Sequence, residues 1–204
     1  MEIRELGMAD AYELTPVQHC DDRGAFLEWF TKDRFEAETG HRIRLAQANS
    51  SVSSRGVVRG IHFADVPPSQ AKYVTCMSGE VLDVVVDLRV GSPTFGTWDA
   101  VRLDDDTRKA VYVAEGLGHV FMALSGRATL TYLCSEQYNP GREHGIHPLD
   151  PDLGIAWPND VEVLLSPKDA EAPGLHDAQR QGLLPSYDAC QALYSARRGQ
   201  ISSG

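Results

Sequence analysis

The length, composition and charge of the chain narrow its class. It has 204 residues, of which 42% are hydrophobic and 24% charged, proportions typical of a folded protein and not of a disordered or fibrous one. Acids outnumber Lys and Arg by 29 to 19, and the net charge of −10 argues against a nucleic-acid partner. No stretch approaches the ~18 apolar residues of a membrane span, and the opening segment lacks the apolar core of a secretory signal. We therefore expect a cytoplasmic protein that does not bind membranes.

The cysteines are widely spaced and include no CxxC pair; they are Cys20, Cys76, Cys134 and Cys190. This spacing favours neither a zinc site nor a disulfide framework. We expect buried, reduced thiols.

The first predicted element is a short helix. Thr31 is a residue type that caps helix N-termini, and Gly40 suits the position just past a C-terminus. The helix is expected between them, through Phe35 and Ala37.

A series of short β-rich runs follows. Residues 72–77 and 82–88 are separated by Ser78 and Gly79, a pair that suits a two-residue hairpin turn. Turn residues separate the next runs, which are residues 97–103, 110–113, 119–124 and 128–134. Strands at a spacing of about 8–12 residues are typical of a β-sandwich or barrel.

Helical signals return near the C-terminus. Ser166 and Pro167 are typical of a helix cap and first turn, and a further helix is expected over residues 187–198. We predict a single domain over residues 1–204, with a barrel core at about 45–135 and a helical tail at about 167–200.

Histidine is the side chain best suited to act as a base near neutral pH. His62 and His119 lie beside glycines in RGIHF and GLGHVF, at the ends of β-rich runs, and each can point to a ligand or to water. The other five lie in polar, turn-like or terminal segments, where surface positions are expected for most of them: His19, His41, His144, His147 and His176.

The spacing of the histidines argues against a metal site. Phe63 and Ala64 follow His62, where a second ligand would be needed, and no HxH, HxxH or HxxxE pattern occurs near His62 or His119. His144 and His147 form an HxxH, but in a loop context with glycine between them.

Several charged side chains have two interpretations. Arg23, Arg55, Arg59 and Lys72 could bind an anion such as phosphate, or be solvated surface charges. Asp169 lies three residues after Ser166, where a carboxylate stabilises a helix start.

Seven segments carry a resemblance that runs in order through residues 10–190. They are DDRGAFLEWF, RLAQANSSVS, RGVVRGIHF, QAKYVTCMSGEVLDVVVDLRVGSPTFG, GLGHVF, TLTYLC, and GIAWP with LSPKDAEAP. Together they resemble the dTDP-4-dehydrorhamnose 3,5-epimerase family. The resemblance implies a mainly β, cupin-type jelly-roll barrel with short helices at the N- and C-terminal ends.

The resemblance also implies a reaction and its catalytic residues. The family inverts carbons that flank the ketone of TDP-4-keto-6-deoxyhexoses, without a metal or an organic cofactor. His62 matches the general base, and Asp169 matches the carboxylate that orients it. Lys72 matches the residue that stabilises the enolate, while Tyr132, which alternates with Leu130 and could simply pack on a sheet face, matches the acid on the opposite face.

A nucleotide-sugar site is implied as well. Its matching residues are Arg23, Glu28, Gln47, Asn49, Arg59, His119, Tyr138 and Glu143. The arginines and amides match positions that contact the diphosphate, nucleotide or sugar, and both glutamates match positions near the thymine. Tyr138 matches the aromatic that stacks on the base, and His119 a pocket histidine near the sugar. Family members are homodimers that exchange N-terminal strands, so a neighbouring subunit is expected to complete the pocket.

Two segments depart from the pattern of the dual-specificity members. GLGHVF stands where those members read GFAHGF, and AKYV where they read GKLV. Both differences recur in relatives that make deoxysugars for antibiotics, several of which invert C3 only. We therefore favour a 3-epimerase over a 3,5-epimerase. Other cupin classes stay open as alternatives: a 3,4-ketoisomerase, a metal-dependent oxygenase and a non-catalytic nucleotide-sugar-binding module.

Overall fold

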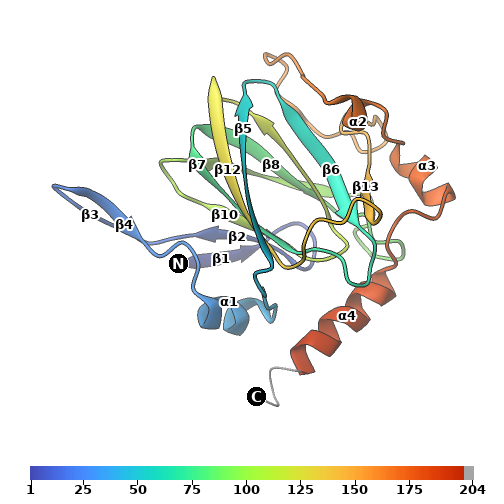
Figure 1. Ribbon diagram of the computed structural model, residues 1–204, viewed down its shortest axis with the longest axis horizontal. Helices are drawn as coiled ribbons and strands as arrows, with labels where there is room; N and C mark the ends of the chain where they lie inside the picture. The colour runs from blue at the N-terminus through green and yellow to red at the C-terminus, as the bar shows by residue number, and fades with distance from the viewer. Residues whose placement is uncertain (200–204) are drawn as a thin grey trace.

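Two antiparallel sheets form the body of the chain in a computed structural model that describes residues 1–199 (Figure 1). The strands of the six-stranded sheet are, in spatial order, β1 (Glu2–Glu5), β2 (Ala11–Thr15), β10 (Ala110–Val113), β7 (Lys72–Ser78), β12 (Arg127–Cys134) and β5 (Gln47–Ser54). Those of the five-stranded sheet are β13 (Glu143–Gly145), β6 (Val58–Ala64), β11 (Gly118–Ala123), β8 (Glu80–Val86) and β9 (Trp98–Asp104). The predicted mainly β barrel is confirmed; the single-domain boundary stays a prediction.

Burial on both faces explains the apolar sequence of β8. Val81 and Val85 pack in the core between the sheets. Val84 and Val86 pack in a second cluster with Leu153, which lies after β13, the last strand in residues 1–199. Successive strand residues point to opposite faces, so one run supplies both clusters.

The predicted hairpin at Ser78 and Gly79 is wrong. β7 pairs with β10 and β12, whereas β8 pairs with β11 and β9, so the chain crosses here from one sheet to the other. Gly79 has a φ of 80°, and a Cβ there would lie 2.2 Å from the Arg127 carbonyl oxygen. A glycine turn indicates a change of direction, but it does not specify the strand with which the next segment pairs.

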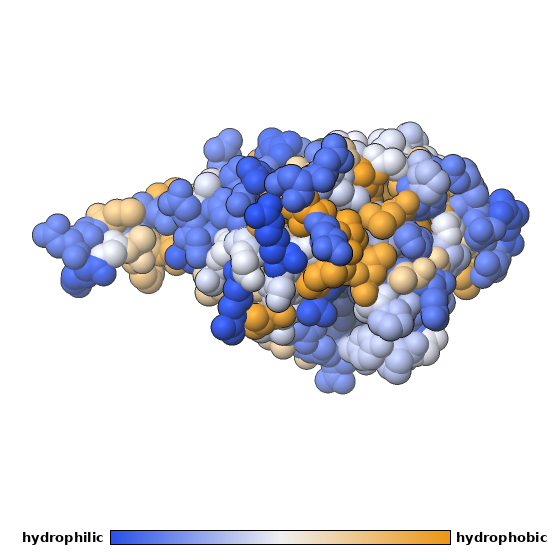
Figure 2. Space-filling view, turned by 90° about the horizontal axis from the view of Figure 1, so that it is seen from above, coloured by the Kyte–Doolittle hydropathy of each residue, from blue (hydrophilic) through white to orange (hydrophobic). Residues whose placement is uncertain are grey.

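The N-terminal segment adds strands outside the expected core range of about 45–135. β1 and β2 extend the six-stranded sheet, and β3 (Gln18–Asp21) and β4 (Gly24–Leu27) form a hairpin that projects from the body as an arm (Figures 1 and 2). Phe26 of this arm and Val17, the residue just before it, are exposed. Cys20 is exposed too, which corrects its predicted burial, because an arm of two strands has no core of its own. The other three cysteines are buried and free, as predicted.

Within residues 1–199, four helices cover the ends of the body: α1 (Lys32–Thr39), α2 (Pro167–Ala170), α3 (Leu175–Arg180) and α4 (Tyr187–Gly199). The helix predicted between Thr31 and Gly40 is confirmed, with a left-handed Gly40 at its end and Phe35 fully buried. No helix within residues 1–199 is long and apolar enough to cross a membrane, and the cytoplasmic location stays a prediction.

A buried charge network joins the N-terminal segment to the barrel. Arg89 is fully buried and donates to both carboxylate oxygens of Asp87 and, at 2.8 Å, to Asp10. Asp10 also lies 3.0 Å from His41 Nε2. His41 is buried and is thus an exception to the surface positions expected for most of these histidines, because the sequence pattern does not show its carboxylate partner.

Candidate active site

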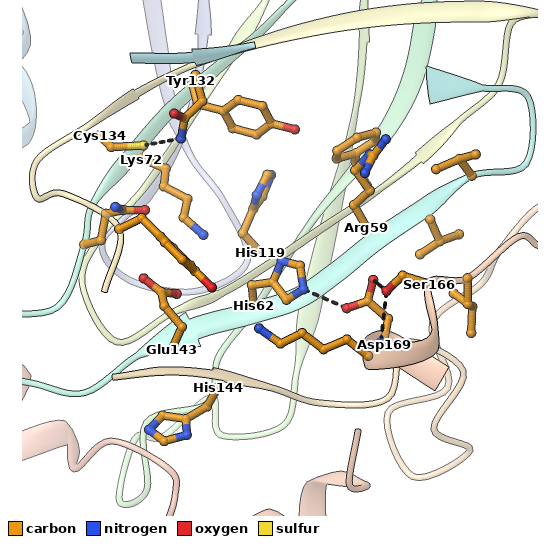
Figure 3. A pocket seen from close by; sticks show the side chains of 18 of the residues that line it. Arg59, His62, Lys72, His119, Tyr132, Cys134, Glu143, His144, Ser166 and Asp169 are labelled. Atoms are coloured by element: carbon orange, nitrogen blue, oxygen red, sulfur yellow. Dashed lines mark hydrogen bonds and ion pairs between the residues drawn. The ribbon is translucent and has the colours of Figure 1, made fainter. Parts of the chain in front are cut away.

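A cavity of about 490 Å³ lies between the sheets and is lined by residues from both of them and from the segment 164–169 (Figure 3). Nine of the twelve predicted site residues line it: Asn49, Arg59, His62, Lys72, His119, Tyr132, Tyr138, Glu143 and Asp169. Residues far apart in sequence thus meet at one concave surface.

His62 of β6 and Asp169 of α2, which the resemblance pairs, are in direct contact in the cavity. His62 Nε2 and Asp169 Oδ1 lie 2.7 Å apart, with the carboxylate side chain 7% exposed and the imidazole 34% exposed. Burial acts to raise the pKa of Asp169, but the hydrogen bond and charge of His62, helped by Ser166 and the Gly60 backbone, hold that pKa below its usual value. The dyad therefore pairs an ionised carboxylate with an imidazole that opens to the cavity.

A backbone bridge brings Asp169 to His62 across 107 residues of sequence. Val58 N–H donates to the Leu164 carbonyl at 3.0 Å, and Leu164 N–H donates to the Gly56 carbonyl at 2.8 Å. Gly56 has a φ of 84°, and a Cβ there would lie 2.0 Å from the Glu162 carbonyl oxygen. Close approach of the segment 161–165 therefore requires glycine at this turn.

Ser166 then fixes the orientation of Asp169. Its Oγ accepts from the Asp169 N–H at 3.1 Å, which confirms the predicted helix cap, and donates to Asp169 Oδ2 at 2.9 Å. The helix-start and dyad interpretations of Asp169 are thus compatible, because its N–H serves the cap and its carboxylate serves His62.

Lys72 and Tyr132 face the dyad from the six-stranded sheet (Figure 3). The Tyr132 hydroxyl lies 3.0 Å from Ser51 Oγ, and burial raises the pKa of the phenol well above its usual value, so it holds its proton. Burial lowers the pKa of Lys72, while the negative charges of Glu143 and Asp83 act in the opposite direction. An imidazole and a protonated phenol thus line the cavity from different sheets, and the Lys72 side chain lines it from β7.

Each cavity histidine has a carboxylate partner. His119 Nε2 lies 2.8 Å from Asp83 Oδ2, and both side chains are buried. His144 Nε2 lies 2.7 Å from Asp65 in an exposed contact, and this residue also lines the cavity edge. Within residues 1–199, no group of three or more His, Cys, Asp or Glu side chains is placed to hold a metal ion.

Polar side chains at the cavity edge are linked to one another. Gln47 does not line the cavity, but its amide donates to Asn49 at 2.8 Å and accepts from the Tyr138 N–H at 2.9 Å. Arg59 Nε donates to Ser53 Oγ at 3.1 Å and Nη2 donates to the Val52 carbonyl at 3.4 Å, so that within residues 1–199 Nη1 is left to bind an anion.

Three charged residues that the sequence analysis proposed as binding candidates lie away from the cavity. Arg23 lies in the arm and pairs with Asp21, and Glu28 is the first residue after the arm. Arg55 pairs with Asp160 at 3.0 Å, which favours its surface interpretation. A single chain therefore does not bring Arg23 and Glu28 to the nucleotide-sugar site.

Several lining residues were missed by the sequence analysis. Lys168 adjoins Asp169 in LSPKD, and this adjacency is a signal that could have identified it. The apolar lining includes Val57 and Leu164, which a backbone bridge joins across the sequence, and no local pattern predicts such a pair.

Known proteins resemble the chain closely over most of its length. Residues 5–177 match the family described as dTDP-4-dehydrorhamnose 3,5-epimerase. A dTDP-4-dehydrorhamnose 3,5-epimerase of Mycolicibacterium smegmatis is 55% identical and is matched over 100% of both chains. The solved structure of NovW, a 4-keto-6-deoxy sugar epimerase from the novobiocin gene cluster of Streptomyces spheroides, is 59% identical, with a TM-score of 0.91 over 93% of this chain and 95% of that one.

A third relative is a 3′-monoepimerase. The structure of ChmJ from Streptomyces bikiniensis in complex with dTDP-quinovose is 51% identical, with a TM-score of 0.93 over 96% of this chain and 98% of that one. Together with the fold and the cavity, these matches establish that the chain belongs to the dTDP-4-dehydrorhamnose 3,5-epimerase family.

Proposed function

We propose that this enzyme, an epimerase of dTDP-4-keto-6-deoxy sugars, inverts C3 of its hexose by removing the proton beside the C4 ketone. The observation that carries the proposal is the cavity, in which the His62–Asp169 dyad lies on one wall and Lys72 and Tyr132 lie on the other. This arrangement supplies a base, an acid and a cation for the developing oxyanion. A role in deoxysugar or antibiotic biosynthesis accords with the NovW relative.

The proposed reaction needs one proton removal and one proton return. His62 takes the C3 proton, and the electrons of the broken C–H bond form an enolate with its charge on O4. The Lys72 ammonium stabilises that charge, while Asp169 stabilises the imidazolium. Tyr132 then gives its phenolic proton to the opposite face of C3, after which solvent returns a proton to Tyr132 and takes the extra proton from His62. Inversion follows because the two groups face the ring from different sheets.

The nucleotide half is proposed to lie at the polar edge. Arg59 supplies a guanidinium for the diphosphate, and Asn49, held by Gln47, supplies an amide. Tyr138 is 56% exposed and offers a ring face for the base. The related ChmJ was solved with dTDP-quinovose bound.

The choice of C3 rests on the chain's own departures from the dual-specificity pattern, at GLGHVF and AKYV. Relatives of both kinds match strongly: a 3-epimerase of Streptomyces niveus at 59% identity and the 3,5-epimerase of M. smegmatis at 55%. Inversion of both C3 and C5 is therefore the alternative outcome of the test.

Solvent deuterium incorporation tests the roles of the two faces. With dTDP-4-keto-6-deoxyglucose in deuterated water, His62→Asn should incorporate no deuterium, because it lacks the base. Tyr132→Phe should still exchange the C3 proton but return it to the same face, giving label without inversion. Tyr12→Phe, a phenol on β2 that does not line the cavity, is the matched control. Exchange in His62→Asn at the wild-type rate would refute the role of His62.

A homodimer is proposed to complete the site through the projecting arm. The support is that Arg23 and Glu28 lie on or beside an arm away from the cavity, and that Val17 and Phe26, likewise beside or on it, are exposed. Co-expression of Arg23→Ala and His62→Ala chains tests this, because a mixed dimer would hold one site with both native residues. Turnover above the sum of the separate variants is expected. Turnover equal to that sum, or a monomeric sedimentation mass, would contradict it.

A further inference from the structure

Asp83 is a buried carboxylate in an apolar row. It lies between Val81 and Val85 on the face of β8 that points into the core between the sheets, and it is 1% exposed. Its Oδ2 contacts His119 Nε2 at 2.8 Å, and its Oδ1 is buried without a hydrogen-bond partner among residues 1–199. The reaction proposed above makes no use of this group.

Such a carboxylate is costly to the fold. A buried polar atom without a partner is unfavourable, and a charged one more so, whereas a third valine in this row would carry no such cost. A buried polar atom without a partner in a native protein calls for an explanation. The contacts of Asp83 therefore indicate what it does.

The contact with Asp83 fixes the tautomer of His119. An ionised carboxylate only accepts hydrogen bonds, so the Nε2 that faces Asp83 carries the hydrogen. Nδ1 is then the remaining nitrogen for a ligand in the cavity that His119 lines. His119 stands opposite His62 in the pairing of β11 with β6, and its ring lies edge-on to Tyr132 with centroids 6.2 Å apart.

The second effect of Asp83 is electrostatic. Lys72 forms no ion pair within residues 1–199, and burial lowers the pKa of its ammonium group. Three groups oppose that change, each from a different strand: Glu143 from β13, Cys134 from β12 and Asp83 from β8. Asp83 also acts to raise the pKa of Tyr132, with Arg59 acting in the opposite direction.

We propose that Asp83 is a positioning residue of this cavity, acting on the substrate through His119 and on Lys72 through its negative charge. It presents His119 Nδ1 to the sugar or the diphosphate, and it keeps Lys72 protonated for the enolate. The kinetic part of this inference rests on the proposed function.

Asp83→Asn tests the proposal because it keeps the shape of the side chain and removes its charge. We expect kcat to fall by about tenfold or more and the alkaline limb of its pH profile to move to lower pH, since Lys72 loses its proton more readily. The melting temperature should not fall, because the variant removes a buried negative charge whose Oδ1 has no hydrogen-bond partner among residues 1–199. Asp99→Asn on the adjacent β9 makes the same charge change outside the cavity and is the control. A normalised pH profile that superimposes on that of the wild type would overturn the electrostatic part.

His119→Gln separates the two effects and also serves if Asp83→Asn does not fold. This variant keeps the Asp83 charge, so we expect a higher KM but an unmoved alkaline limb. A limb that moves equally in both variants would contradict a direct action of Asp83 on Lys72.

The tautomer of His119 gives a readout that needs no turnover. In protein labelled with ¹⁵N-histidine, the wild type should show His119 with hydrogen on Nε2, and Asp83→Asn should redistribute the hydrogen between the nitrogens. An unchanged spectrum would refute the action through His119. A wild type without deuterium exchange but with this tautomer change would refute the proposed function and leave the positioning of His119 supported.

Discussion

Asp169→Asn should slow epimerisation while leaving the fold intact. The amide keeps the size of the carboxylate and can still contact Ser166, but it cannot neutralise the imidazolium that forms when His62 takes the proton. A hydrogen bond to a charged group contributes about 1.5–3 kcal/mol, which corresponds to a rate loss of about 10- to 150-fold. Since His62 is 34% exposed, water weakens the pair, and we expect the lower part of that range, about 10- to 50-fold.

The assay for this variant is the initial rate of deuterium incorporation at saturating substrate, so that a change in binding does not contribute. Asp160→Asn is the matched control, because Asp160 lies in the same stretch of chain but is an exposed acid that does not line the cavity. The reasoning is refuted if Asp169→Asn retains wild-type kcat, or if the control loses as much activity.

Three further measurements test the buried charge pairs and the Gly56 turn. The free energy of unfolding of the wild type should exceed that of Asp169→Asn most clearly above pH 3.8 and lose this excess in more acid solution, because the folded-state pKa of Asp169 lies below 3.8; a difference that grows on acidification would contradict this sign. Gly56→Ala should cost about 1–3 kcal/mol of stability and displace Asp169, whereas Gly126→Ala, with open space around its Cβ position, should be nearly neutral in chemical denaturation. Arg89→Met should destabilise the fold by about 3–5 kcal/mol by leaving buried carboxylates unpaired, against about 0–1 kcal/mol for Arg102→Met at an exposed ion pair; equal unfolding midpoints would refute this.

Local patterns predicted the elements better than their partners. The apolar run of β8 and the cap at Ser166 follow from residue type and spacing. The crossover at Gly79 and the burial of His41 do not, because each depends on groups distant in sequence: the strands that flank β7 and β8, and the carboxylate of Asp10.

In the candidate site, too, local sequence did not predict the partners of the residues. The pairing of His62 with Asp169 was expected only through family resemblance, since a backbone bridge at Leu164 creates it. Asp83 gave no signal in the sequence, where it interrupts a strand like any exposed acid, and its burial is evident only in three dimensions. Arg23 was a candidate from its sequence context and from the resemblance, but within a single chain it lies in the arm, away from the cavity, and pairs with Asp21.

The central claim is most directly tested by proton NMR of the enzyme with dTDP-4-keto-6-deoxyglucose in deuterated water. The account predicts loss of the C3 proton signal with inversion at that carbon and retention of the C5 proton. Loss of both signals would make the enzyme a 3,5-epimerase and contradict the choice of C3. No exchange at either carbon, with dTDP still bound, would contradict proton abstraction by His62 from this substrate.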